Sequence, residues 1–204
     1  MDELNNLEFD ESLFDAYFED MEIPKEEKER RADFSKKFNK AILLIFATIA
    51  VMKSYNYLRR KYIVDRLSRE YRDILSQYMD IDEYLNGYIN DFAEQTTETT
   101  FKNIDDDFFL SDDRAFLISV NEANTGFNYK DYVNAIESGK THKKWITEKD
   151  KRVRRTHREL DDKTIPILDT FKVGKTKMRY PKDMMYANAN LEEVAGCRCS
   201  IKYL

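Results

Sequence analysis

The pattern of apolar residues predicts that the N-terminal half of the chain is helical. Between about Ala32 and Met79 no Gly or Pro interrupts the sequence, which favours unbroken helix. Within it, Ala41–Met52 (AILLIFATIAVM) is the most apolar stretch of the chain. It is expected to form a helix that is buried on all sides, in its own bundle or against a partner protein. Further along, apolar residues recur at spacings of three, four and seven, which gathers them on one helix face. This stripe consists of Ile63, Leu67, Tyr71, Ile74, Leu75 and Tyr78.

Three more helices are predicted between residues 82 and 138. They cover Asp82–Asn103, Arg114–Asn128 and Tyr132–Ser138, and Gly139 is expected to end the last one. The acidic run at residues 105–107 lacks the spacing of a calcium-binding loop, so we interpret it as a solvated turn and helix cap.

The pattern changes after Trp145. The last segment, CRCSIKYL, alternates, with Cys197, Cys199, Ile201 and Tyr203 on one side, and this period of two predicts a strand. Only 5 Gly and 3 Pro occur in 204 residues, which favours long helices over a many-stranded sheet. The predicted fold class is therefore α+β, with long N-terminal helices followed by a small C-terminal α+β domain. The predicted divisions are an acidic arm at 1–31, a helical region at 32–113 and a C-terminal domain at 114–204.

Charge is distributed unevenly along the chain. Residues 1–22 carry nine acidic side chains and no basic one, whereas residues 140–182 carry fifteen Lys or Arg residues against six Asp or Glu. The basic region could bind nucleic-acid phosphates without sequence preference. Alternatively, the acidic arm docks on it, or these are ordinary solvated surfaces. The basic residues considered for nucleic-acid contact are Lys143, Lys144, Lys151, Arg155, Arg158, Lys175 and Lys177.

Two apolar patterns point to partners. Leu7, Phe14 and Phe18 recur at helical spacing, so the arm is expected either to form a short docking helix or to order only on a partner. As a helix, Ala41–Met52 spans about 18 Å, which is too short for a bilayer core of about 30 Å. Flanking Lys and Arg side chains could lengthen that span, so a membrane-active role is an alternative. The acidic N-terminus is neither a secretory signal nor a transit peptide.

A cluster of polar residues is predicted within WITEKDKRVRRTHRELD. If a helix follows Asp150 as its N-cap, then Asp150, Arg154, His157 and Asp161 share one helix face. Such a face could serve acid–base chemistry in a hydrolase or nuclease. A buried polar network that stabilises the fold is the favoured interpretation, because buried charges need partners wherever they occur. The residues assigned to this network are Glu122, Trp145, Asp150, Arg152, Arg154, His157 and Asp161.

The only two cysteines are Cys197 and Cys199, and residues two apart rarely form an unstrained disulfide. A strand directs both sulfurs to the same side, and together with His157 and a carboxylate or water they would make a tetrahedral zinc site. Paired zinc-binding cysteines usually have two or more residues between them. Buried reduced thiols without a cofactor are therefore the first expectation, and zinc is the alternative. No phosphate-binding glycine loop and no nucleophile-elbow motif occurs.

A longer ordered pattern runs through the C-terminal ninety or so residues. It begins with Arg114, Ala115, Ile118 and Glu122, continues with Trp145, Asp150, Arg152, Val153, Arg154, His157, Leu160 and Asp161, and ends with Phe171, Tyr180, Pro181, Asp183, Cys197, Arg198 and Cys199. In its order and spacing this pattern resembles the C-terminal domain of the phage Mu F-like minor head proteins, the phage head-morphogenesis family. Four positions depart from the family pattern: Ser119 replaces Ala, Asn121 replaces Thr, Asp162 replaces Gly and Gly196 replaces Asn.

The resemblance implies a bacteriophage structural protein and not an enzyme. It implies contact with the portal protein or the major capsid protein, and a role in head assembly, DNA packaging or DNA ejection. The expected location is the virion, in the head interior or at the portal vertex, and the host cytoplasm during assembly. Expected partners are the portal or capsid protein, packaged double-stranded DNA and further copies of the chain.

Overall fold

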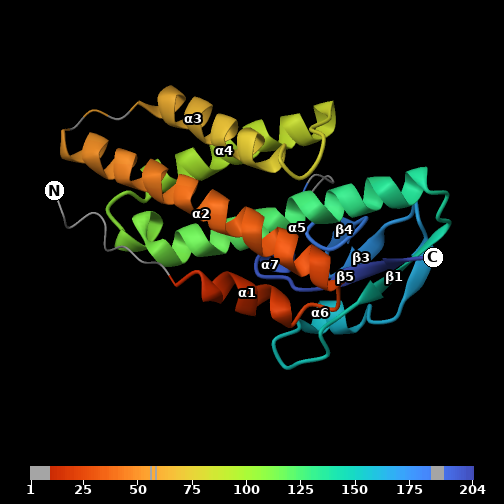
Figure 1. Cartoon of the computed structure of the whole chain (residues 1–204). Coiled ribbons are helices and arrows are strands. Elements are labelled where there is room, and N and C mark those ends of the chain that lie inside the picture. The colour runs from red at the N-terminus through yellow and green to blue at the C-terminus, as the bar shows by residue number, and fades with distance from the viewer. Residues whose placement is uncertain (1–9, 56, 58, 185–190) are drawn as a thin grey trace. The chain divides into compact units, whose positions relative to one another are not determined.

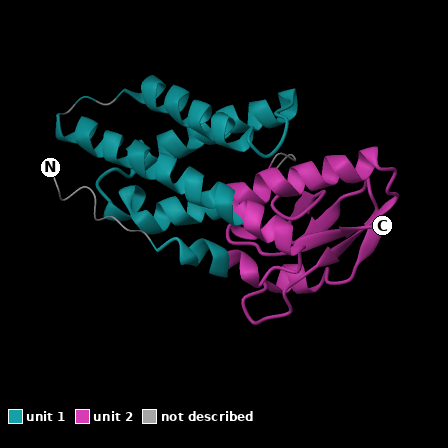
Figure 2. Ribbon diagram, viewed as in Figure 1, with its two compact units in different colours: residues 1–16, 32–120 teal, residues 17–31, 121–204 magenta. Residues whose placement is uncertain are grey.

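The protein has an α+β fold in the computed structural model, which describes residues 10–55, 57, 59–184 and 191–204 (Figure 1). Long helices come first along the chain and the strands follow, as the sequence predicts. The chain divides into two compact units, coloured separately in Figure 2: unit 1 is residues 1–16 and 32–120, and unit 2 is residues 17–31 and 121–204. The domain boundaries predicted at residues 31 and 113 remain predictions, because this division reflects compactness and not independent folding.

The acidic arm contains the short helix that its apolar spacing predicts. This helix, α1, spans Ser12–Glu19 and has Phe14 and Phe18 buried. The ring of Phe14 lies 5.0 Å from that of Phe116, measured between centroids. Leu7 lies outside the described residues.

In its described part, unit 1 is helical. Besides portions of α1, α2 (Lys25–Ser54) and α5 (Asp112–Glu137), it contains α3 (Arg60–Leu75), α4 (Glu83–Lys102) and the 3-10 helix η2 (Asp107–Leu110). The side chain of Asp82 caps α4 by accepting a hydrogen bond from the backbone N–H of Leu85. Asp106 caps η2 in the same way. The predicted helix at 82–103 and the predicted acidic cap are thus confirmed.

The unbroken helix predicted from residue 32 to residue 79 is wrong. Helix α2 ends at Ser54 and α3 begins at Arg60, and Arg59 itself has φ −111° and ψ 82°. The reversal brings the ring of Phe38 in α2 within 4.6 Å of the ring of Tyr71 in α3. In one straight helix these residues would lie about 50 Å apart. Burial of aromatic rings therefore breaks the helix where neither Gly nor Pro marks the sequence.

The predicted apolar stripe is largely confirmed. Five of its members are buried in α3: Ile63, Leu67, Tyr71, Ile74 and Leu75. The sixth, Tyr78, lies beyond the end of α3, and its hydroxyl contacts Asp33 and Lys37 of α2.

Ala41–Met52 is not buried on all sides within the chain itself, so only its burial against a partner protein stays a prediction. Ile42 and Ile49 are buried, but Leu44 is 60% exposed and Val51 is 57% exposed. Together with Ala47, these two residues form one exposed apolar face of α2, called the Leu44 face below. Among the described residues, no helix combines the length and apolar character needed to cross a membrane.

Helix α5 replaces the two separate helices predicted at 114–128 and 132–138. Asn128 lies inside this helix, and its side chain makes tertiary contacts. Its Oδ1 accepts a hydrogen bond from the Arg31 guanidinium at 2.9 Å, and its Nδ2 donates to the carbonyl of Pro181 at 2.8 Å. The helix ends just before Gly139, which has φ 73°, as its predicted role requires.

Two small antiparallel sheets follow α5 in unit 2. One has the strand order β2-β1-β5, from Thr164–Pro166, His142–Ile146 and Ser200–Tyr203. The other pairs β3 (Phe171–Val173) with β4 (Thr176–Met178). Two single-turn helices, α6 (Arg155–Arg158) and α7 (Leu191–Val194), complete the unit. The predicted C-terminal strand is confirmed at residues 200–203 only, because Cys197 and Cys199 lie before β5. Sequence analysis missed β1.

Candidate site at His157, Cys197 and Cys199

The candidate site lies in the core of unit 2, beside Trp145. Alternation along β1 buries both Lys143 and Trp145. The indole of Trp145 meets the rings of Phe171 and His157 edge-on, with centroids 5.1 Å and 5.6 Å away. This core also includes Leu160, Val173, Met178, Val194, Cys197 and Cys199.

His157 and the two cysteines converge in this core. The Nδ1 atom of His157 lies 3.5 Å from the Sγ atom of Cys197 and 3.5 Å from that of Cys199. All three side chains are buried, and their donor atoms lie within 4.8 Å of one another. The predicted inward orientation of both thiols toward His157 is therefore confirmed. Whether they bind a metal stays a prediction, although one imidazole and two sulfurs form a donor set that suits zinc.

Glu193 fixes the orientation of the His157 ring. The His157 Nε2 atom lies 3.2 Å from Oε2 of Glu193, and the same oxygen accepts a hydrogen bond from the Thr156 hydroxyl at 2.8 Å. With the Nε2 proton directed at this carboxylate, the Nδ1 lone pair faces the two sulfurs. Sequence analysis missed Glu193, which no motif distinguishes from the adjacent Glu192.

The two thiols differ in acidity. Hydrogen bonds from Cys199 and His157 lower the pKa of Cys197 well below its usual value, although burial opposes the shift. The pKa of Cys199 is raised by Cys197 and by burial. Burial lowers the pKa of His157, but the hydrogen bond and charge of Cys197 outweigh it and raise that pKa. Of the two thiols, that of Cys197 is therefore the more acidic.

A cavity of about 20 Å³ borders the three side chains. It has room for about one water molecule. Besides His157, Cys197 and Cys199, its lining residues are Glu148, Arg152, Val153, Arg154, Gly196 and Arg198.

The prediction that Asp150, Arg154, His157 and Asp161 share a helix face is wrong. Helix α6 covers only residues 155–158, and Asp150 instead organises the turn before it. Oδ1 of Asp150 accepts hydrogen bonds from the backbone N–H groups of Arg152 and Val153, at 2.9 Å and 3.1 Å. A turn held by hydrogen bonds to the Asp150 side chain therefore stands where a longer helix was expected.

Asp150 also forms ion pairs with two arginines. Nη2 of Arg198 lies 2.5 Å from its Oδ2, and Nε of Arg152 lies 3.2 Å from the same atom. The hydrogen bond from Arg198 lowers the pKa of Asp150 to about 2. Arg152 and Arg198 both reach Asp20 as well, so the acidic segment before α2 takes part in this network.

The other predicted network residues make separate contacts. Arg154 donates to the carbonyl of Ala195, and Asp161 accepts a hydrogen bond from the backbone N–H of Thr147 at 2.9 Å. Glu122 is buried in α5. The charges of Cys197 and Glu122 favour the ammonium form of Lys182, but burial dominates and lowers its pKa to about 8. These residues are therefore internal structural contacts spread over the unit.

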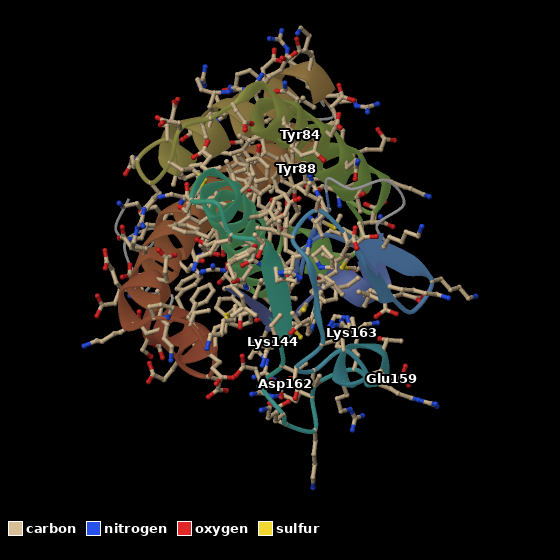
Figure 3. The ribbon with its side chains drawn as sticks, turned by 90° about the vertical axis from the view of Figure 1, so that its right-hand side faces the viewer. Tyr84, Tyr88, Lys144, Glu159, Asp162 and Lys163 are labelled. Atoms are coloured by element: carbon tan, nitrogen blue, oxygen red, sulfur yellow. The ribbon has the colours of Figure 1, made fainter. Side chains whose placement is uncertain are left out.

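Six of the seven residues considered for nucleic-acid contact are at least partly accessible. Lys151, Arg155, Arg158, Lys175 and Lys177 are exposed, and Lys144 is half-buried beside Asp162, with its Nζ 3.2 Å from Oδ1 (Figure 3). Assigning Lys143 to this surface is wrong, because its side chain is buried. Its ammonium lies 5.0 Å from the ring centroid of Tyr132 and 5.6 Å from that of Phe171. The period of two in β1, with Trp145 inward, was the signal that could have revealed this.

No known family matches this chain, and no curated protein or solved structure matches it either. The resemblance of residues 114–203 to the Mu F-like head proteins therefore stays a prediction from the motif residues.

Proposed function

We propose that the protein is a bacteriophage minor head protein, not an enzyme, that binds the portal or the major capsid protein during head assembly. The observation that carries this proposal is that the motif residues are used within the unit itself. Asp150 forms an ion pair with Arg198, and Arg154 donates a hydrogen bond to the carbonyl of Ala195. Asp161 accepts a hydrogen bond from the backbone N–H of Thr147, and the His157 ring contacts the two cysteine sulfurs. Use of these four motif residues for contacts inside the unit is expected of a structural module.

The departures from the family pattern support the same assignment. Asp162 stands where Gly is usual and has φ 61°, and Gly196 stands where Asn is usual and has φ 64°. Gly, Asn and Asp are the residues that tolerate this left-handed region best. Both substitutions therefore keep the backbone geometry that the pattern needs.

The small cavity favours a structural role over a hydrolase or nuclease. An active site must admit the reacting part of a substrate, but the cavity beside His157 holds about one water molecule. The charged residues proposed for acid–base chemistry are also dispersed, as described above.

The Leu44 face is the surface we assign to the portal protein. Exposed Leu44 and Val51 lie two turns apart on the same side of α2, where a partner protein would bury both. The exposed basic residues of unit 2 would then lie near packaged DNA in the head interior.

Co-purification tests this function. The chain is expressed with the portal and major capsid proteins of its phage, and its position in purified particles is determined by antibody labelling. Leu44→Ser combined with Val51→Ser should weaken portal binding, whereas Leu168→Ser, at a residue 71% exposed in unit 2, should not. A monomer that ignores both proteins and is missing from particles would refute the proposal.

A His157→Ala variant separates the structural reading from the enzymatic one. Removing one member of a buried polar group leaves its partners unpaired, at about 1–3 kcal/mol. We expect a lower free energy of unfolding with no loss of turnover. A variant that unfolds like the parent but loses a nuclease activity would favour the enzyme.

A further inference from the structure

The spacing of three donor atoms in unit 2 matches the coordination shell of one metal ion. In a tetrahedral zinc site, with bonds of about 2.3 Å to sulfur and about 2.0–2.1 Å to nitrogen, the nitrogen and sulfur donors lie about 3.5 Å apart. Nδ1 of His157 lies 3.5 Å from Sγ of both Cys197 and Cys199. All three donor atoms lie within 4.8 Å of one another, so one ion can reach all of them with small side-chain adjustments.

Hydrogen bonding to the His157 ring cannot satisfy both thiols equally. The Nδ1 atom has a single lone pair when its ring proton is on Nε2, and two thiols at equal distance cannot both donate to it fully. A cation in the centre would engage the lone pair and both sulfurs together. The donor set also selects the ion, since two thiolates and one imidazole in a tetrahedral arrangement favour zinc.

The surroundings of His157 have the form expected around a metal ligand. A metal-bound histidine usually directs its second ring nitrogen at a carboxylate, which fixes the ring and strengthens the donor. Glu193 occupies this position, held by the Thr156 hydroxyl and pressed against Gly174, where a side chain would collide with it. The cavity of about 20 Å³ beside the sulfurs leaves room for one water as the fourth ligand, with Glu148 among its lining residues.

We propose that His157, Cys197 and Cys199 bind one zinc ion, that a water molecule in the adjoining cavity completes the tetrahedron, and that Glu193 is the positioning residue for His157. The ion ties α6 to the segment that enters β5, so binding stabilises unit 2. The proposal does not depend on the assignment of the chain as a head protein.

Metal content and spectroscopy of the whole chain test this site. Protein purified under reducing conditions should contain about one zinc ion per chain. After replacement of zinc by cobalt, its spectrum should show the ligand-field bands of a tetrahedral ion and sulfur-to-cobalt charge transfer. Bound zinc should protect both thiols from labelling, and a chelator should lower the Tm. Folded parent protein with reduced thiols that binds neither ion would overturn the proposal.

Variants test the ligand assignment. Cys197→Ser and Cys199→Ser should each abolish the charge-transfer band or reduce it strongly. Because these variants could unfold, Glu193→Gln provides a second test, since it keeps all three donors and should weaken zinc binding by about 10–100-fold. His142→Ala, which changes the other histidine at an exposed position, is the control and should bind zinc like the parent. Equal binding by all four variants would exclude this site.

Discussion

Gly174, in the turn between β3 and β4, lies directly against the carboxylate of Glu193. A Cβ atom added at Gly174 would collide with Oε1 of Glu193, and the backbone there has φ 58°. We therefore expect Gly174→Ala to lower the free energy of unfolding by about 1–3 kcal/mol, through backbone strain and displacement of Glu193. Denaturant titration measures this change.

Gly87 provides the matched control for that substitution. It lies inside α4, and nothing within 4 Å would meet an added Cβ. Gly87→Ala should instead stabilise the protein by about 0.5–1 kcal/mol, because Ala loses less conformational entropy in a helix. Equal effects at the two glycines would contradict the packing of Glu193 against Gly174.

Arg31 should be among the most sensitive charged positions in unit 2. Its buried guanidinium donates to Asn124 at 2.7 Å, to Asn128 at 2.9 Å and to Asp131 at 3.0 Å. Arg31→Met leaves these partners unpaired and should lower the free energy of unfolding by about 3–5 kcal/mol. Arg30→Met breaks a partly exposed ion pair with Glu27. This variant should change the free energy of unfolding by at most about 1 kcal/mol. Thermal unfolding of the two variants compares them directly, and similar losses would refute the prediction.

Lys143 should make stability rise with pH above neutrality. Burial lowers its pKa to about 8, from an ordinary value of 10.5. Between these values the unfolded chain holds a proton at Lys143 that the folded chain has released, so the free energy of unfolding increases with pH. Lys143→Met should remove about half of this rise, because Lys182, whose pKa is also lowered to about 8, contributes similarly.

At pH 7 the same variant should be more stable than the parent. Lys143→Met avoids burying an ammonium group and should raise the free energy of unfolding by about 1–3 kcal/mol, although contacts with two aromatic rings are lost. Lys144→Met is the control, because Lys144 is the adjacent, half-buried residue of β1. In this variant the free energy of unfolding should rise with pH as it does in the parent. An unchanged pH profile in Lys143→Met would contradict the lowered pKa.

DNA binding, if the basic surface serves it, should depend on salt and not on sequence. Lys175 and Lys177 are exposed in the β3–β4 hairpin. Replacing both with Gln should reduce the slope of log affinity against log salt by up to about 2, since each phosphate contact contributes about 0.9. Lys25→Gln, at an exposed residue of α2, should leave the slope unchanged. Absence of binding at low salt, or binding that ignores salt, would exclude this interaction.

The sequence by itself determined the α+β class, the buried stripe of α3 and the C-terminal strand. It also predicted that Cys197 and Cys199 face His157, a geometry that the structure confirms. The stripe and the strand follow from local periodicity, because the 3.6-residue helix and the two-residue strand repeat set which side chains share a face. The end of α5 before Gly139 is another such feature, because it depends only on the backbone conformation of that glycine. The two cysteines face His157 although they precede β5, which begins only at Ser200.

Only the tertiary structure decided the break between Ser54 and Arg60, the continuity of α5 through Asn128, the burial of Lys143 and the place of Glu193. Each depends on a partner distant in sequence: Tyr71 for the ring of Phe38, Arg31 for Asn128, and His157 for Glu193. Periodicity carries no information about such partners. Packing of distant side chains outweighs local propensity by enough free energy to reverse what the local pattern predicts.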